Sequence, residues 1–360
     1  MRVILAERLF ADDANTAMMI AILHHGVSGR HAVQTDPMPV LNSAAEGNHW
    51  VWPSEIQNWL AQQSQAVRET VELCINQALT LQADQLPART LVVVEAAGDE
   101  LFEVSEAWVP LPRAKQLLEM ALKVMVENAG NDRAFLLAFA PDEHATALRN
   151  AEDGGWLEFV NGGGITDARN QVEALNPQKP RRFRHFVLFD SDSASPNQPS
   201  SDARKLKREC EAANIPFHAL RRRAAENYLP LPALEQWANS PGHAPNLDAG
   251  QRAPRVRALA KLKPDLRYHY NFKGGFAADN RMQWSQERDE ARTRFLADLQ
   301  PALRTDLSSG IHKDIADLYA NRRYTMNRHW FLNEDSDREI AEAPQSLAGS
   351  VSTCWHRPMN

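Results

Sequence analysis

Between residues 133 and 222, short apolar segments alternate with amphipathic segments, and this alternation constrains the fold more than any other feature of the chain. The apolar segments have the length and composition of strands, and the segments between them carry apolar residues at helical spacing. The predicted strands are 134–140, 156–161, 183–190 and 215–222, and the predicted helices are 141–151, 166–175 and 201–214. Strands that alternate with helices of about 10 to 15 residues form a parallel sheet with helices on its faces.

Three polar motifs follow strands of this predicted sheet. Gly162–Gly164 follow the second strand, Asp190 and Asp192 lie at the end of the third, and Arg221–Arg223 lie at the end of the fourth. Ligands of open α/β sheets bind beyond the carboxyl ends of the strands. We therefore expect these motifs to converge on one edge of the sheet.

The aspartate pair is the most specific of the three motifs. Side chains alternate along a strand, so Asp190 and Asp192 are predicted to point to the same side and to share one cation. Magnesium prefers oxygen ligands and is often held by one or two carboxylates plus substrate phosphates. The alternative is that these residues only form a turn or a helix cap.

The glycines and the arginines have structural explanations as well. The arginines either meet phosphates or form a solvated basic strand end before a helix. Three glycines between a strand and a helix allow close approach of a phosphate, or simply form a tight turn. The segment after Arg221–Arg223 contains Glu226, which is predicted to complete a cation site with Asp190. Further on, Lys273 lies between aromatic residues and a glycine pair, where it would either offset phosphoryl charge or belong to a packed turn.

Outside this block the pattern predicts other units. A strand at 1–5, a helix at 12–25 and a helical block at 54–81 indicate an α/β region over 1–132. Residues 89–112 fit either two strands or a strand followed by a helix, and 112–130 fit an amphipathic helix. The unit of alternating strands and helices spans 133–238. Residues 239–255 are rich in Pro, Gly, Asn and Ala and predict a linker, and 256–360 predict a basic, aromatic and mainly helical region.

Composition limits the classes of protein to consider. The chain has 360 residues, 43% of them hydrophobic, and a net charge of -6, so any nucleic acid must be bound by local basic patches. Its three cysteines, Cys74, Cys210 and Cys354, show no zinc or disulfide spacing. No apolar stretch approaches the roughly 20 residues needed to span a bilayer. We therefore expect a cytoplasmic protein without a membrane partner.

The order of these motifs resembles the Toprim domain of the overcoming-lysogenisation-defect (OLD) nucleases and related phage-defence effectors. The resemblance covers about residues 133–230, and its specific parts are FVLFDSDS and RRRAAENYLP. It implies a Toprim-like parallel sheet, a Mg (or Mn) cofactor, nucleic acid, most simply DNA, as substrate and an ATPase as partner. Carried over by position, Asp190, Asp192 and Glu226 are the metal ligands, and Lys273 takes the place of the catalytic lysine.

The family's first strand ends in Glu-Gly, and its glutamate acts in acid-base and metal chemistry. If residues 134–140 are this strand, Phe139 and Ala140 stand at those positions, and the nearest acids are Asp142 and Glu143. This placement makes Glu143 a candidate catalytic residue.

A second candidate for the same role is Glu95. The segment LVVVEAAGDE places Glu95 and Asp99 in the family's Glu-x-x-x-Asp pattern, at the cost of a longer insertion before the glycines. Glu7 is a third and poorer candidate, and the sequence leaves the choice open.

Three functions follow from these observations. The first is a Mg-dependent nuclease that hydrolyses phosphodiester bonds in DNA or RNA, in which Lys273 or Arg222 offsets phosphate charge and which acts in anti-phage defence with an ATPase partner. The second is a degenerate Toprim subunit that binds or regulates without catalysis, suggested by Phe139. The third is a metal-dependent nucleotide-sugar transferase that uses the aspartate pair. The oligomeric state is left open, a homo-oligomer included.

Overall fold

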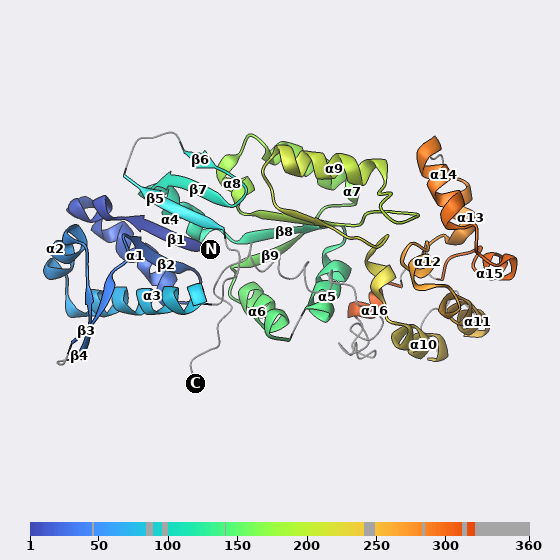
Figure 1. Cartoon of the computed structure of the whole chain (residues 1–360), viewed down its shortest axis with the longest axis horizontal. Coiled ribbons are helices and arrows are strands. Elements are labelled where there is room, and N and C mark those ends of the chain that lie inside the picture. The colour runs from blue at the N-terminus through green and yellow to red at the C-terminus, as the bar shows by residue number, and fades with distance from the viewer. Residues whose placement is uncertain are drawn as a thin grey trace.

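The structure is a computed structural model of the chain, and it describes residues 1–44, 47–83, 89–95, 100–140, 142–240, 249–282, 285–311 and 315–320. The described residues form two parallel sheets flanked by helices, followed by a group of short helices (Figure 1). The predicted α/β class is therefore confirmed. None of the described helices is both long enough and apolar enough to cross a membrane.

The first sheet is built from the N-terminal part of the chain in the strand order β2-β1-β5-β7-β6. Its strands are β1 (Arg2–Ala6), β2 (Ala32–Asp36), β5 (Thr90–Val94), β6 (Leu101–Phe102) and β7 (Glu106–Pro110). All neighbours pair in parallel except β6 and β7. Residues 89–112 thus contain three strands and the start of a helix, more elements than either predicted alternative.

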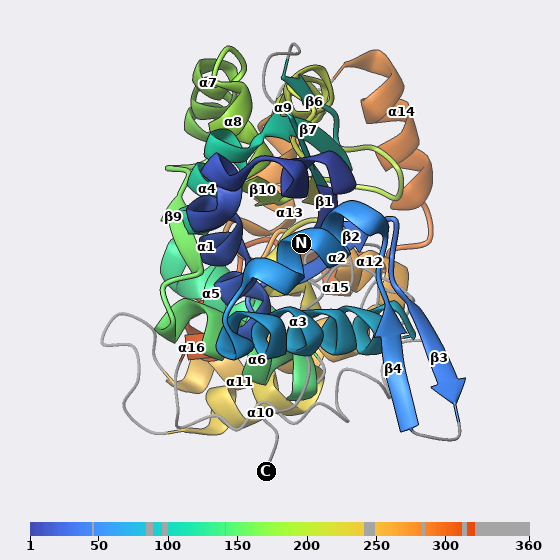
Figure 2. The same cartoon turned by 90° about the vertical axis from the view of Figure 1, so that its left-hand side faces the viewer.

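Helices pack against this sheet because their apolar faces join its core. They are α1 (Thr16–Val27), α2 (Ser54–Gln62), α3 (Gln65–Ala83) and α4 (Leu111–Glu119), with the short 3-10 helices η1 (Glu7–Ala11) and η2 (Asp13–Asn15). Burial alternates along β1, so Val3 and Leu5 face inward and pack with Ile22 of α1 and Trp59 of α2. A hairpin of β3 (Val40–Ala44) and β4 (Gly47–Val51) projects from the body (Figure 2).

The second sheet holds the motifs that the sequence singles out. Its strands are β8 (Leu122–Val126), β9 (Leu157–Asn161), β10 (His185–Phe189) and β11 (Phe217–Ala219). They are all parallel, in the order β11-β10-β8-β9, which places β8 and β10 at the centre. The carboxyl ends of all four strands therefore meet at one edge.

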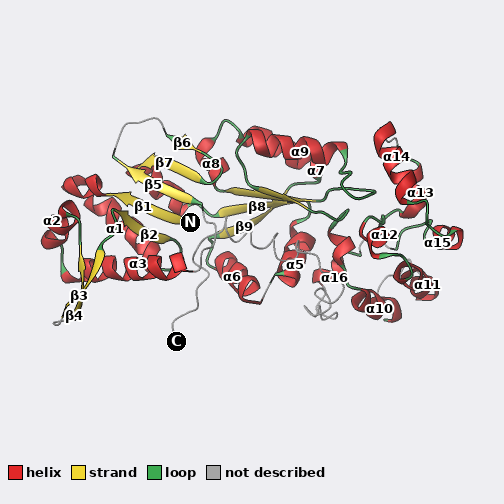
Figure 3. Cartoon of the chain, in the orientation of Figure 1, coloured by secondary structure: helices red, strands yellow, loops and turns green. Residues whose placement is uncertain are grey.

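Helices cover both faces of the second sheet (Figure 3). They are α5 (Ala129–Phe139), α6 (Asp142–Asp153), α7 (Ile165–Leu175) and α9 (Ser201–Ala212), whereas the short α8 (Lys179–Phe183) contacts β6 and places Phe183 in the core of the first sheet. Neighbouring residues of β8 serve opposite faces, because Val124 packs into the cluster that contains Phe135 and Leu148, whereas Met125 packs with Val172 and Leu206. The sheet is thus buried on both sides, as parallel sheets are.

Two predicted elements in this region are wrong. The helix predicted at 112–130 ends at Glu119 and is followed by β8, and the strand predicted at 134–140 is part of α5. No proline or glycine separates α4 from β8, so their apolar residues merge into one apparent period. A short apolar run such as 134–140 does not distinguish a buried helix from a buried strand. The second sheet therefore begins before residue 133.

The C-terminal part of the chain is mainly helical, as predicted, over the residues that the structure describes. Its elements are η3 (Ala225–Tyr228), α10 (Leu231–Asn239), α11 (Ala249–Ala260), α12 (Pro264–Tyr268), α13 (Gly275–Asn280), α14 (Gln286–Phe295), α15 (Pro301–Asp306) and α16 (Asp317–Ala320). Helix α11 takes up part of the predicted linker 239–255, since alanine and arginine favour helix there despite Pro254. Residues 241–248 and 321–360 lie outside the described residues.

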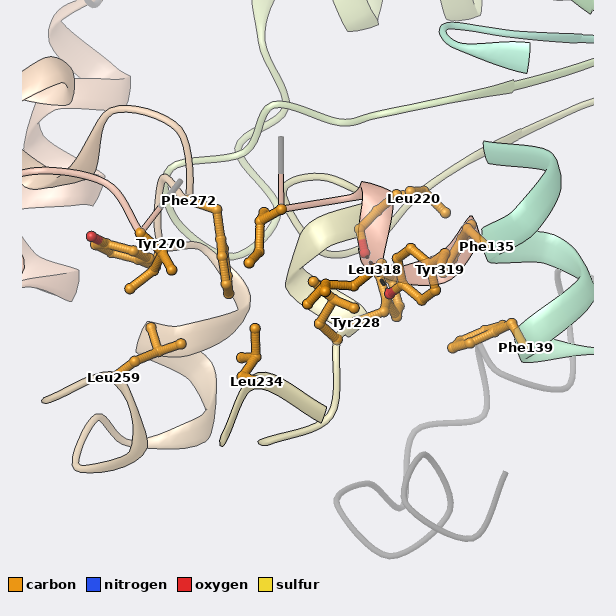
Figure 4. Close-up of a cluster of buried hydrophobic side chains, with 14 of the residues drawn as sticks. Phe135, Phe139, Leu220, Tyr228, Leu234, Leu259, Tyr270, Phe272, Leu318 and Tyr319 are labelled. Atoms are coloured by element: carbon orange, nitrogen blue, oxygen red, sulfur yellow. Dashed lines mark hydrogen bonds between the residues drawn. The ribbon is translucent and has the colours of Figure 1, made fainter. Parts of the chain in front are cut away.

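These helices share one hydrophobic core with the second sheet. Figure 4 shows Phe135 and Phe139 of α5 beside Tyr228 of η3 and Tyr319 of α16. The ring centroid of Phe135 lies 5.4 Å from that of Tyr228 and 5.2 Å from that of Tyr319. The same cluster continues through Tyr270, so the C-terminal helices are held firmly at the carboxyl edge of the sheet.

Candidate active site

The two central strands of the second sheet each end in an acidic residue. Glu127 follows β8 directly, and Asp190 follows β10 directly. The backbone N–H of Asp190 donates a hydrogen bond to Oε1 of Glu127 over 3.2 Å, so the two strand ends are in contact. Glu127 is therefore the acid that follows the first strand of this sheet.

Glu127 is absent from the residues predicted from sequence, because 112–130 fit a single helix. A usable signal was present, since the apolar Val124–Val126 run directly into Glu127 and then into Asn128, a favoured helix-capping residue. The side chain of Asn128 accepts hydrogen bonds from the N–H groups of Gly130 and Asn131 and so starts α5. The segment is thus a strand, an acid and a helix cap in succession.

Asp132 is a second acid at this edge that was not predicted from the sequence. It lies in the first turn of α5, and its Oδ2 accepts a hydrogen bond from the N–H of Asn128 over 2.9 Å. The carboxylate is thereby folded back toward the end of β8 and toward Glu127.

Asp190 and Asp192 lie at the same edge, but strand alternation does not place them there. Strand β10 ends at Phe189, and Asp192 adopts a left-handed backbone with φ 49°. Hydrogen bonds to the loop after β11 hold the pair instead. The Asp192 N–H donates to the carbonyl of Arg223 over 2.8 Å, and Oδ1 of Asp190 accepts from the Ala225 N–H over 3.1 Å.

Glu226 belongs to the same acidic group and has a cationic partner. It is buried in η3, and its Oε1 lies 2.9 Å from Nζ of Lys273. Lys273 precedes Gly274 and Gly275, and a Cβ on Gly275 (φ +66°) would lie 2.4 Å from the Ser308 carbonyl oxygen. The glycine therefore lets this turn pack closely enough to present Lys273 to Glu226. The structure brings four of the predicted residues, Asp190, Asp192, Glu226 and Lys273, to one edge.

Burial and mutual repulsion disturb the titration of these acids. Burial, together with the nearby Asp192 carboxylate, raises the pKa of Glu127 to about 7. Burial raises the pKa of Asp132 to about 6, and burial and repulsion by Glu127 hold the pKa of Asp190 well above its usual range. Such shifts mark a group of carboxylates that gain from a nearby cation.

Lys273 responds to the same charges in the opposite sense. Burial lowers the pKa of Lys273, but attraction to Glu226, Asp190 and Glu127 outweighs it, so the pKa is raised overall. The ammonium group therefore stays charged beside the carboxylates at neutral pH. It neutralises only part of their combined charge.

The donor set of this edge fits magnesium by its chemistry. The ligands on offer are carboxylates, and magnesium commonly takes one or two of them and completes its shell with water and substrate phosphates. Among the residues that the structure describes, no three acidic, histidine or cysteine side chains are already gathered tightly enough to enclose an ion.

Of three other predicted acids, Glu95 lies away from this edge, and the other two are not fully described. Glu95 follows β5 of the first sheet, where it is exposed and lines a cavity of about 390 Å³ with Leu9 and Asp12. Glu143 lies in α6, and its side chain is outside the described part of the chain. Asp99, the proposed partner of Glu95, is also outside it.

Arg222 is packed rather than presented to the site. Its guanidinium lies 3.8 Å from the ring centroid of Tyr268 and 4.5 Å from that of Tyr228. Nη1 also donates to the carbonyl of Asn227 over 2.8 Å, and the residue is only 6% exposed. These contacts assign Arg222 to the junction between η3 and α12.

The three glycines form a close turn at the end of β9. The N–H of Gly162 donates to the carbonyl of Val126 over 2.6 Å, and a Cβ at Gly162 would lie 2.9 Å from that oxygen. Gly163 and Gly164 have φ values of 72° and 92°, which favour glycine. The motif thus fixes the end of β9 against β8, one residue before Glu127.

No protein-family model matches the chain, and no curated protein or solved structure is significantly similar to it.

Proposed function

We propose that the protein is a metal-dependent nuclease that hydrolyses phosphodiester bonds, with the carboxyl edge of the second sheet as its active site. The observation that carries the proposal is the contact between Glu127 and Asp190 at the ends of the two central strands, with Lys273 on Glu226 beside them. The resemblance to the Toprim domain supports the proposal, and in it Glu127 takes the place of the family's glutamate.

Glu127 also removes the reason for expecting a degenerate module. That hypothesis depended on Phe139 standing at the end of the first strand, whereas Phe139 is a buried residue of α5. An acid does follow the first strand of the second sheet. Catalysis is therefore the better proposal.

The chain's own groups have distinct tasks in this proposal. Asp190 and Asp192 would hold magnesium, with Glu127 or Glu226 beside them, and the bound ion would supply charge to activate water and stabilise the leaving oxygen. Glu127, at the end of β8 and in contact with the Asp190 N–H, is placed to take a proton from the attacking water. Lys273 offsets the charge that develops on the phosphate.

The test is a cleavage assay with Mg²⁺ or Mn²⁺ on supercoiled DNA, linear duplex DNA and single-stranded RNA. We expect the wild type to cleave at least one of them, and Glu127→Gln and Asp190→Asn to lower the rate by about 10²-fold or more. Glu95→Gln is the matched control, because Glu95 also follows a parallel strand but in the first sheet. Equal cleavage rates in the wild type and in all three variants would contradict the proposal.

The setting of this activity is part of the same proposal. Action with an ATPase partner in defence against phage follows from the family resemblance alone, which is an associational argument. Co-purification of an ATPase with the tagged chain, and loss of phage protection in Glu127→Gln, would test it.

A further inference from the structure

The loop that carries the aspartates continues into a compact turn beyond Asp192. The Ser200 N–H donates to the carbonyl of Ser191 over 2.8 Å and closes this loop, which we call the Ser191–Ser200 loop. Within it, the Gln198 N–H donates to the carbonyl of Ser195, and Asn197 has φ 60°. Figure 1 shows α9 leading away from this loop and α14 lying on its far side.

Two arginines from separate helices bind neighbouring carbonyls of this loop. Arg204 of α9 is exposed, and its Nη1 donates to the carbonyl of Pro199 over 3.1 Å. Arg288 of α14 is 8% exposed, and its Nη2 donates to the carbonyl of Gln198 over 3.3 Å. Two helices that are far apart in sequence thus bring two cations to one loop.

The surroundings of this arginine pair are rich in positive charge. Arg292, one turn along α14, binds Asn280 through its Nη2 over 3.0 Å. The buried Asp279 is engaged by Arg223 through two hydrogen bonds of 2.8 Å. Burial first, and then repulsion by Arg204 and Arg223, lower the pKa of Arg288 despite attraction by Asp192.

The position of the pair indicates what it binds. Asp192 is one of the carboxylates at the edge of the second sheet, and it lies in the Ser191–Ser200 loop whose carbonyls accept hydrogen bonds from the two arginines. A polyanion whose reacting phosphate lies at the carboxylates has its next phosphates nearby, and arginine binds phosphate well. Because the chain has a net charge of -6, such a ligand needs a local basic surface of this kind.

We propose that the exposed Arg204 binds phosphates of the nucleic-acid backbone where α9 and α14 meet the Ser191–Ser200 loop, and that the buried Arg288 supports this site by holding the Gln198 carbonyl of the same loop. The inference rests on the proposed nuclease function. It assigns the arginines to binding, so they act on the grip of the substrate and not on the bond-breaking step.

The test measures binding of a fluorescein-labelled DNA duplex, and of an RNA strand of the same length, by anisotropy with Ca²⁺ in place of Mg²⁺. We expect Arg204→Gln to weaken binding by about 3- to 10-fold, and Arg204→Gln/Arg288→Gln to weaken it further. Each lost phosphate contact lowers the slope of log affinity against log salt by about 1 between about 50 and 200 mM salt. In cleavage, KM rises and kcat changes little.

Arg294→Gln is the matched control, since Arg294 is exposed on another side of α14 and its Nε binds the Glu290 carbonyl. If Arg288→Gln fails to fold, the exposed Arg204 alone carries the test. Binding of wild-type strength and slope in Arg204→Gln, with a wild type that binds and cleaves, would overturn the inference and leave the proposed function intact. A wild type that neither binds nor cleaves would overturn both.

Discussion

Nζ of Lys273 lies 2.9 Å from Oε1 of Glu226, and this ion pair joins the loop between α12 and α13 to the acidic edge of the second sheet. The Glu226 side chain is 5% exposed and the Lys273 side chain 59%, so a buried carboxylate directs a cation that still reaches solvent. The ammonium group of Lys273 is therefore accessible from solvent. It also shows that the C-terminal helices contribute to the site.

Replacement of Lys273 should lower the rate of cleavage. We expect Lys273→Met to lower kcat by about 10²- to 10³-fold, because a positive charge near the developing phosphate charge is lost. Lys273→Arg should retain part of the activity. Steady-state cleavage kinetics, with circular dichroism to check folding, measure both.

The control for this change is Lys263→Met. Lys263 pairs with Asp298 over 3.2 Å, but both side chains are at least 70% exposed, so its loss should leave the rate unchanged. Equal kinetics in Lys273→Met and Lys263→Met would show that Lys273 has no part in the reaction.

The buried pair of Arg223 and Asp279 should matter for stability. Both residues are nearly inaccessible, and Arg223 donates two hydrogen bonds of 2.8 Å to Asp279. Removing one member leaves a buried charge, so Asp279→Ala should lower the free energy of unfolding by about 3–5 kcal/mol. Urea denaturation measures the change, and Asp298→Ala of the exposed pair should cost less than about 1 kcal/mol. Similar losses in the two variants would contradict the prediction.

Gly162 should be sensitive to a single added methyl group. A Cβ there would lie 2.9 Å from the Val126 carbonyl oxygen and would push the end of β8, which carries Glu127. Displacement of a reacting group by about 1 Å can lower the rate by 10²-fold, so Gly162→Ala should cleave markedly more slowly.

Gly155→Ala is the control variant for Gly162→Ala. Gly155 has φ 71° and open space around its Cβ position, at the turn between α6 and β9. This variant should lose about 1–2 kcal/mol of stability through backbone strain and keep its cleavage rate. Faster cleavage by Gly162→Ala than by Gly155→Ala would be evidence against the role of the β9 turn.

Much of the fold can be predicted where a hydrophobic pattern is bounded by turn-forming residues. Strands β9 and β10 and helices α7 and α9 are predicted because apolar runs are bounded there by glycines, aspartates and serines. The helix at 134–140 resembles a strand in sequence because Phe135, Leu136 and Phe139 are buried in a short continuous apolar run. The partly buried Ala134, Leu137 and Ala138 are apolar as well, so the helical period of burial is not visible in the sequence.

The site is harder to predict because its members meet only in three dimensions. Asp190 and Asp192 stand out in sequence, but Glu127 is hidden by the merged pattern of α4 and β8. Lys273 is predicted from its aromatic and glycine neighbours and its place downstream, but its contact with Glu226 depends on the packing of the C-terminal helices. Long-range packing of this kind leaves no local pattern in the sequence.

The metal-free protein should become less stable as the pH rises through the range in which Glu127 and Asp132 lose their protons. Their folded pKa values of about 7 and about 6 lie above the ordinary values of 4.5 and 3.8, so the folded state binds protons more tightly than the unfolded state. The stability that these protons contribute is complete below about pH 4 and is lost as the pH rises to about 7.

The matching measurement compares the wild type with Glu127→Gln by urea denaturation in EDTA at about pH 5 and pH 8. The amide that this substitution introduces carries no charge, so the variant should be more stable than the wild type at pH 8 by about 1–3 kcal/mol, and by much less at pH 5. Added Mg²⁺ should reverse this order at pH 8, because a cation favours the ionised carboxylates of the wild type. A stability difference that is the same at both pH values, with and without Mg²⁺, would show that Glu127 does not titrate within the acidic group.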